Sequence, residues 1–431
     1  MAKLLGHSHS VSIMRVAAKW SVACSSLIAA IAHAQTAFID DYVPQPAYSA
    51  QTRAPLATQS PRLTVTTLVS GLTRPWAVEF LPDGRMLLAE LPGRIRIVEV
   101  NGELSTPLAG LPAIRAYGSQ GLHDIALDPE FADNRWVYFS YMAAPPGNTG
   151  AGSDEEYELW TQRFEEAGES GAPRGENEFG TRKVGRARLS EDQTRFEDSQ
   201  VIFEAPVRRM VFGPDRSLFA TTVIGGAEDT PQQMDSRFGK VLRFNPDGSI
   251  PNDNPWVGEP GVDPALFAVG FRDPQGADIN PRTGELWTVE NGPRGGDELN
   301  IIRAGRNYGW PVISYGRNYD TQPIGDGIAV KEGMEQPLYF WSPSIAPSDM
   351  VFYTGDLIPQ WQGNVLVGAL AGEHLARLVL VGDQVVAEER LFVGFEDRIR
   401  DVRQSPDGAV ILATDNGKLL KLTPKPPPPS P

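Results

Sequence analysis

The sequence predicts an all-β protein, folded as a six-bladed β-propeller of four-stranded antiparallel blades. An apolar strand, a tight turn built on Pro, Asp, Asn or Gly, and a second apolar strand recur along the chain. This strand–turn–strand pattern recurs every ~40–70 residues without long helical periodicity, which is typical of the repeated blades of a β-propeller. Six such units fit the 431 residues best. Two unrelated β domains remain the alternative.

Five copies of the hairpin phrase carry this prediction. Each joins two apolar runs through Pro-Asp-Gly or a related turn, which reverses the chain tightly. They occupy residues 78–88, 125–139, 210–219, 277–287 and 402–412, and third strands follow at 94–100, 240–244 and 418–422. Loops at one end of such a ring converge, so residues distant in sequence can face one ligand.

The N-terminus is typical of a signal peptide over residues 1–34. Basic residues precede the apolar run 20–31, and small residues end at Ala34, where a signal peptidase would cut. The run is shorter than the ~20 residues of a membrane span, so we expect no span after cleavage. The only cysteine, Cys24, would be removed with it. We therefore expect a periplasmic or secreted protein without disulfides.

The rest of the chain divides by composition. Residues 35–62 are an N-terminal extension without periodicity, 63–423 form the propeller, and 424–431 are a proline-rich tail. The formal net charge of −15 becomes −18 when the basic signal is removed, which excludes nucleic acid as a partner. The Glu-rich stretch 154–178 is interpreted as a solvated loop.

Two segments contain side chains suited to ligand binding. Residues 290–298 combine glycines, a proline and acids after a strand, which suits calcium ligation and equally suits a tight solvated loop. Residues 397–403 place Arg398 and Arg400 two apart, so both point the same way on an extended chain. Such a fork could bind an anionic planar ligand, or each arginine could pair with a nearby aspartate. The lone His123 between apolar neighbours is interpreted as structural.

Six motifs together resemble the soluble glucose/sorbosone dehydrogenases that use pyrroloquinoline quinone. The resemblance spans residues 65 to 423, and the set is specific although each motif alone is weak. That family consists of secreted or periplasmic six-bladed propellers. The motifs are Gly71–Ala77, Gly118–Leu122, Phe271–Gly276, Asn291–Glu298, Asn307–Pro311 and Arg398–Val402.

The resemblance implies two cofactors, pyrroloquinoline quinone and calcium, at the channel mouth. Arginines would contact the quinone and its carboxylates, loop carbonyls would hold calcium, and a glutamine would face the substrate. The matching residues are Arg272, Arg398 and Arg400 for the quinone, Gly292 and Pro293 for calcium, Asp297 and Glu298 with Tyr308 for a further calcium, and Gln120 with Arg272 for catalysis.

The sequence also departs from the family pattern. The family's general base is a histidine just before the strand at 209–212, but residues 203–208 contain none. Glu204, Asp273 and His374 are the candidate substitutes, since each could accept a proton. Asp273 itself stands where the family has asparagine, and Ala371 stands where it has a lysine.

Three functions follow from these observations. The first is a quinoprotein dehydrogenase that oxidises an aldose or similar alcohol by hydride transfer to the quinone, passing electrons to an external acceptor. The second is a catalytically degenerate propeller that binds a sugar or a protein partner, because the family base is absent. The third is a lactonase-like hydrolase, because calcium and carboxylates in a propeller channel also suit lactone hydrolysis.

Overall fold

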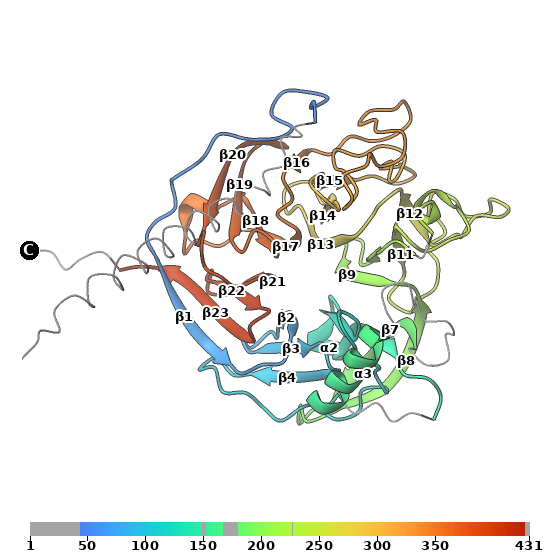
Figure 1. Cartoon of the computed structure of the whole chain (residues 1–431). Coiled ribbons are helices and arrows are strands. Elements are labelled where there is room, and N and C mark those ends of the chain that lie inside the picture. Colours follow the sequence, from blue (N-terminus) through green and yellow to red (C-terminus); the bar gives the residue numbers. More distant parts are fainter. Residues whose placement is uncertain (1–43, 148–151, 167–179, 226, 427–431) are drawn as a thin grey trace, which may run out of the picture. The chain divides into compact units, whose positions relative to one another are not determined.

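Six antiparallel sheets are arranged in a ring around a central axis, which confirms the predicted propeller (Figure 1). The computed structural model describes residues 44–147, 152–166, 180–225 and 227–426. Five sheets have four strands, and the sheet of β2, β3 and β4 has three. The predicted signal peptide and the last five residues of the proline-rich tail lie outside the described residues.

Each blade contributes one strand to the inner ring. We number the blades 1 to 6 in chain order. Blade 1 contains β2 (Pro75–Phe80), β3 (Met86–Glu90) and β4 (Arg94–Val98); blade 2 contains β5 (Leu122–Leu127), β6 (Trp136–Ala143), β7 (Thr181–Leu189) and β8 (Phe196–Glu204). Blade 3 contains β9 (Val207–Phe212), β10 (Leu218–Thr222), β11 (Lys240–Phe244) and β12 (Leu266–Val269). Blade 4 contains β13 (Pro274–Ile279), β14 (Leu286–Glu290), β15 (Asp297–Ile302) and β16 (Tyr339–Trp341). Blade 5 contains β17 (Pro347–Phe352), β18 (Val365–Ala369), β19 (Leu375–Val381) and β20 (Gln384–Leu391). Blade 6 contains β21 (Ile399–Gln404), β22 (Val410–Thr414), β23 (Lys418–Pro424) and β1 (Leu63–Ser70).

Blade 6 is completed by the N-terminal strand. β1 pairs antiparallel with β23, from Leu63 opposite Pro424 to Ser70 opposite Lys418. The two strands lie side by side in blue and red in Figure 1. Because β1 comes first and β23 last in the propeller, this pairing closes the ring and leaves no gap between blades 1 and 6.

The predicted extension is attached to the propeller over its described part. Thr52 forms a bridge with Phe340 of β16, and Leu56 forms one with Glu388 of β20. The Gln51 side chain is fully buried and donates to Pro337 O at 3.0 Å. Residues 44–62 therefore follow the outer edges of blades 4 and 5, whereas their composition predicted only an extension without periodicity.

The burial of a strand depends on its position within the blade. The second strands β3, β10, β14, β18 and β22 are buried at every position, because inter-blade cores cover both faces. The outermost strands β1 and β8 show several exposed positions. This explains why apolar runs in the second strands carried the clearest signal in the sequence.

Helices are few in the described residues. They are α2 (Phe131–Asn134), α3 (Asp154–Glu166) and the 3₁₀ turns η1 (Thr230–Gln232) and η2 (Pro359–Trp361). No helix in this part of the chain is long and apolar enough to cross a membrane.

Helix α3 corrects the expectation of a solvated loop over residues 154–166, whereas 167–178 lie outside the described residues. The Ser153 hydroxyl accepts a hydrogen bond from Glu156 N at 3.2 Å, as in a capping box. Acids occupy the first turn and Arg163 the last, which suits the helix dipole. Tyr157 and Trp160 fall on one face and pack against the propeller. The many charged residues of this segment made its amphipathic spacing hard to recognise in the sequence.

A buried ion-pair cluster crosses the propeller axis. Arg209 of β9 lies 3.0 Å from Asp124 of β5 and 2.9 Å from Asp401 of β21. Arg403 lies 2.8 Å from Asp349 of β17, which also pairs with Arg209. Four inner strands are thus tied together by charges that are fully or largely buried, so breaking one pair would leave a buried charge without a partner.

Candidate active site

One end of the propeller channel gathers the residues that the motifs singled out. At this end each inner strand begins and each second strand ends, so the loops before β5, β9, β13 and β21 meet. We call this cluster the mouth. Its members are Arg74, Gln120, His123, Arg182, Arg208, Arg272, Asp273, Asn291, Arg398, Arg400 and Asp415.

Arg208 and Asp273 connect two neighbouring blades at the mouth. Arg208 Nε lies 3.2 Å from Asp273 Oδ1, and Gln275 Nε2 donates to Asp273 Oδ2 at 2.7 Å. Arg208 ends the segment in which the resemblance implies a histidine, and Asp273 stands where it implies an asparagine. The two departures from the family pattern are therefore partners in one ion pair.

His123 lies beneath this pair. Its Nε2 is 2.9 Å from Ser119 O and 3.4 Å from Nη1 of the Arg208 guanidinium. Since a carbonyl only accepts and an arginine only donates, the shorter contact makes Nε2 a donor to Ser119 O. Burial, followed by the charge of Arg208, holds the pKa of His123 well below its ordinary value. His123 is therefore neutral, which agrees with the structural role expected for it.

Gln120 is oriented by Arg182. Arg182 Nε and Nη2 both donate to Gln120 Oε1, at 3.2 and 3.0 Å. Burial, followed by the charge of Arg208, lowers the pKa of Arg182 to about 10. The guanidinium remains charged at neutral pH, so the mouth has two neighbouring, partly buried cations, Arg182 and Arg208.

Three arginines share one carboxylate on the opposite side. Arg400 binds Asp415 through two contacts of 2.9 Å, while Arg398 and Arg74 lie 3.4 and 3.7 Å from the same carboxylate. Arg400 also stacks over Trp76, 4.1 Å from the ring centroid. Arg398 and Arg400 do face the same way, as predicted. One carboxylate cannot neutralise three guanidiniums, so this side of the mouth is electropositive.

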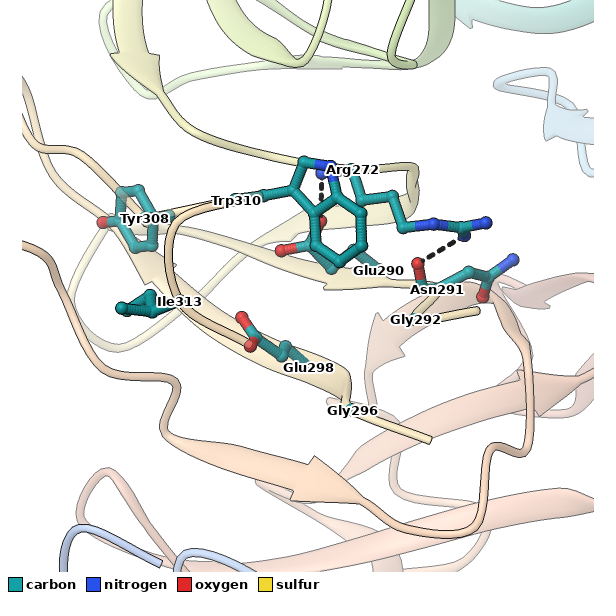
Figure 2. A pocket seen from close by; sticks show the side chains of 9 residues that line it. All are labelled: Arg272, Glu290, Asn291, Gly292, Gly296, Glu298, Tyr308, Trp310 and Ile313. Atoms are coloured by element: carbon teal, nitrogen blue, oxygen red, sulfur yellow. Dashed lines mark hydrogen bonds between the residues drawn. The ribbon is translucent and has the colours of Figure 1, made fainter. Parts of the chain in front are cut away.

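Arg272 links the mouth to an adjacent pocket, shown in Figure 2. Its backbone N donates to Glu290 Oε2 at 2.8 Å, and its guanidinium donates to Asn291 O at 2.8 Å. The guanidinium also lies 5.7 Å from the Trp310 ring centroid. These contacts fix the arginine at the boundary between Asp273 and the pocket.

The pocket contains two facing carboxylates. Glu290 of β14 stands directly opposite Glu298 of β15, and Asn300 Nδ2 donates to both, at 3.3 and 3.1 Å. Both side chains line the pocket in Figure 2, together with Tyr308. Neither carboxylate has an arginine or lysine ion-pair partner among the residues that the structure describes.

The electrostatics of this pocket favour a cation. Burial raises the pKa of Glu290 to about 7, and burial followed by the charge of Glu290 raises the pKa of Glu298 well above its ordinary value. The side-chain oxygens of Asn291 and Asn300 are buried without hydrogen-bond partners. Two carboxylates and unpartnered amide oxygens are hard ligands, so the donor set fits calcium. Within the described residues no group of three or more His, Cys, Asp or Glu side chains forms a preassembled metal cage.

The predicted Gly292-Pro293 calcium loop is held rigidly. Asp297 is fully buried, and its carboxylate accepts hydrogen bonds from Gly292 N, Ser344 Oγ and Ile345 N, at 2.7 to 2.8 Å. A Cβ on Gly292 would approach Gly295 O to 2.2 Å, so the loop requires glycine there. The geometry makes Asp297 an anchor for the loop, while a metal role for Asp297 stays a prediction.

The three candidate bases have different surroundings. Glu204 is on the outermost strand of blade 2 and pairs with Lys183 at 2.9 Å. His374 is buried, and its Nδ1 lies 2.7 Å from Gly372 O. Burial lowers the pKa of His374, and its Nε2 is buried without a hydrogen-bond partner. Only Asp273 of these three belongs to the mouth and adjoins Arg272.

Helix α3 supports the loop that carries Gln120. Tyr157 Oη donates to Gly118 O at 2.7 Å, and Gly118 N donates to Thr161 Oγ1 at 2.9 Å. Arg74 Nε contacts the same tyrosine hydroxyl at 3.3 Å. The helix therefore fixes the loop that carries Gln120 at Gly118.

Sequence reasoning missed Arg182, Asp415 and the pairing of Glu290 with Glu298. Arg182 follows an insertion that obscures strand register, and Asp415 begins an Asp-Asn-Gly turn that resembles an ordinary hairpin. The pairing of Glu290 with Glu298 could have been predicted from the sequence. Both glutamates flank the Gly-rich loop, so a hairpin over 286–302 would have placed them opposite each other.

The fold and this mouth define a β-propeller of the sugar dehydrogenase class. The family model described as Glucose / Sorbosone dehydrogenase matches residues 72–421, and the chain belongs to that family. An aldose sugar dehydrogenase of Escherichia coli is 35% identical over 374 residues, covering 84% of this chain and 93% of the relative. A crystal structure of a glucose dehydrogenase is 39% identical with a TM-score of 0.73, covering 83% of this chain and 99% of that one. A quinone-bound (PQQ-bound) aldose sugar dehydrogenase of Streptomyces coelicolor is 25% identical with a TM-score of 0.63, covering 84% of this chain and 99% of that one.

Proposed function

We propose that this protein is a quinoprotein dehydrogenase that oxidises a sugar or similar alcohol, with Asp273 as its general base. One observation carries the choice of base. The Asp273 carboxylate lies in the mouth beside Arg272 and is fixed by Arg208 and Gln275. Each carboxylate oxygen can accept a further proton besides these contacts. A fixed carboxylate at the mouth can therefore do the work of the missing histidine.

Four side chains of the mouth would take the other roles in the reaction. Asp273 takes the proton of the substrate hydroxyl, and Arg208 keeps the carboxylate in one orientation. Arg272 supplies a fixed positive charge next to the reacting oxygen. Gln120, held by Arg182, orients a second hydroxyl through its amide.

The mouth also suits the two cofactors. Arg398 and Arg400, with Arg74, would hold the carboxylates of pyrroloquinoline quinone, and bound quinone would supply the oxidant for hydride transfer. The carbonyls of Gly292 and Pro293 would hold calcium as a Lewis acid. A second calcium would neutralise the glutamate pair of the pocket in Figure 2.

The cellular setting follows from the same proposal. A cleaved signal over 1–34 would place the mature protein in the periplasm or outside the cell. There an external acceptor would take electrons from the reduced cofactor. The substrate is a small sugar or alcohol.

Reconstitution tests the proposal. Purified protein is mixed with pyrroloquinoline quinone and calcium, and dye reduction is followed with a panel of aldoses and alcohols. Sugar-dependent dye reduction is expected. A folded, cofactor-loaded protein that reduces no dye would instead support the propeller that binds without catalysis, which the absent histidine favours.

A further inference from the structure

The N-terminal extension is attached to blade 4 through one fully buried side chain, Gln51. Its Nε2 donates to Pro337 O at 3.0 Å, and its Oε1 accepts from Ala47 N at 2.7 Å. The same Oε1 lies 3.1 Å from the hydroxyl of Tyr315. Because a buried amide is stable only when it is hydrogen-bonded, these contacts hold the extension in one register on the blade.

The attached segment continues a row of residues that crosses the sheet of blade 4. Thr52 forms a bridge with Phe340 of β16, Phe340 stands opposite Glu298 of β15, and Glu298 stands opposite Glu290 of β14. Two hydrogen bonds of 2.8 Å fix the outer end of this row, from Phe340 N to Gln51 O and from Thr52 Oγ1 to Phe340 O. One row of the sheet therefore connects the extension to both carboxylates of the pocket.

Tyr315 makes a second connection between the extension and the pocket. Its ring stacks on Phe340, with 4.1 Å between the ring centroids. Its backbone and that of Gly316 pack so closely against Gly296 that a Cβ on Gly296 would collide with both. Gly296 lines the pocket, as Figure 2 shows. A displacement of Tyr315 would therefore loosen the wall of the pocket.

A rigid wall matters because the pocket contains two like charges. Glu290 and Glu298 are directly opposite each other on neighbouring strands, an arrangement that is destabilising without a cation. If β15 and β16 were less firmly held, the two carboxylates would move apart. A cation would then have to order them when it binds, which lowers affinity, whereas a preordered pocket avoids this cost.

We propose that residues 44–62 form a clasp that preorganises this pocket for calcium, with Gln51 as the positioning residue. The inference rests on the proposed function, because that proposal assigns the calcium to the pocket. Gln51 acts through Tyr315 and Phe340, which lie between it and the pocket. The clasp thus gives the extension a role in cofactor binding.

Terbium luminescence tests the clasp without relying on turnover. Terbium(III) occupies calcium sites and emits light when a neighbouring Trp or Tyr is excited, and Trp310 and Tyr308 both line the pocket. Full-length, cofactor-free protein is titrated with terbium, and competition with calcium then gives the calcium affinity. Loss of the emission in Glu298→Gln assigns the signal to this pocket.

Two variants of the clasp should weaken calcium binding. Gln51→Met keeps the shape but removes the hydrogen bonds, and Tyr315→Phe removes only the hydroxyl. We expect calcium binding about tenfold weaker in each, which is the typical worth of a buried hydrogen bond. The double variant should be no weaker than Gln51→Met, because both changes remove the same contact. The terbium emission lifetime should also shorten, because a looser pocket admits water to the ion.

A matched control lies in the same extension. The Ser60 hydroxyl donates to Glu389 and accepts from Trp361 Nε1 at 2.7 Å, so Ser60→Ala removes buried hydrogen bonds on blade 5. It should keep the calcium affinity and emission lifetime of the wild type even if its melting temperature falls. Circular dichroism shows whether each variant is folded, and Tyr315→Phe serves if Gln51→Met is not.

The other outcomes separate this inference from the proposed function. Equal calcium affinities in the wild type and in Gln51→Met, or equal losses in Gln51→Met and Ser60→Ala, would overturn the clasp alone. A wild type without any calcium-competed emission that depends on Glu298 would refute the clasp and the calcium pocket together. Weakened calcium binding in Gln51→Met, with no dye reduction by the reconstituted wild type, would support the clasp and refute only the dehydrogenase proposal.

Discussion

Arg208 and Asp273 come from neighbouring blades and meet at 3.2 Å, in two segments where the resemblance implies other residues. The resemblance implies a histidine-bearing loop and an asparagine at these places. Removing either charged residue alone would leave the other as a partly buried charge without its ion-pair partner.

The role of Asp273 can be tested by Asp273→Asn. The amide keeps the shape and the contact with Arg208 but cannot take the hydroxyl proton, so turnover should fall by at least ~10²-fold. Quinone binding, followed by absorbance titration, should change much less. Glu204→Gln and His374→Gln are the controls, and a large loss in either, with little in Asp273→Asn, would contradict the assignment.

The quinone contact of Arg400 can be tested by Arg400→Gln. Loss of one charged hydrogen-bonding group typically costs about 1.5–3 kcal/mol, which corresponds to roughly 10- to 100-fold weaker quinone binding. Arg282→Gln is a suitable control, because Arg282 is exposed and pairs with Asp383 on the surface. Equal affinities in both variants would show that Arg400 only supports Asp415.

The calcium pocket can be tested by chelation. An ion held only by the native state stabilises it by mass action, so metal removal should lower the melting temperature. In metal-free protein, Glu298→Gln should raise the melting temperature, because it removes the repulsion with Glu290. In calcium the same change should lower it. Insensitivity of the wild type to complete chelation would argue against a metal in this pocket.

We expect the free energy of unfolding to depend on pH through Glu79, which lies near the buried ion pairs of the axis. Burial raises the pKa of Glu79 from 4.5 to about 7, although Arg403 opposes the shift. Because the pKa of Glu79 is higher in the folded than in the unfolded protein, its protonated form favours the folded state. This contribution to stability is complete below about pH 4.5 and is lost as the pH rises through about 7. Glu79→Gln should thus gain up to about 3 kcal/mol over the wild type at pH 8, and less than about 1 kcal/mol near pH 5. Urea unfolding at both pH values measures this, and an equal gain at both would exclude titration of Glu79 as the cause.

The ring and the position of its mouth were predictable from local chemistry. Pro-Asp-Gly turns and runs of buried strand residues are determined by neighbours in sequence, so the blades could be predicted. Arg398 and Arg400 were likewise found, because their two-residue spacing places them on one side of β21.

The partners of these residues could not be predicted in the same way. Arg208 meets Asp273, and Arg182 meets Gln120, only through the register between strands and blades. Helix α3 was missed for another reason. Its core-facing residues at 157, 160 and 164 are separated by charges that dominated the composition.

The pairing of β1 with β23 also orders the assembly of the molecule. The strand that closes the ring is synthesised first, and its partner is synthesised last among the strands. Until the C-terminal segment is released, blade 6 lacks Arg400 and Asp415, so a nascent chain has neither a closed ring nor the cations of one rim. The site therefore assembles only when the first and last strands of the propeller pair.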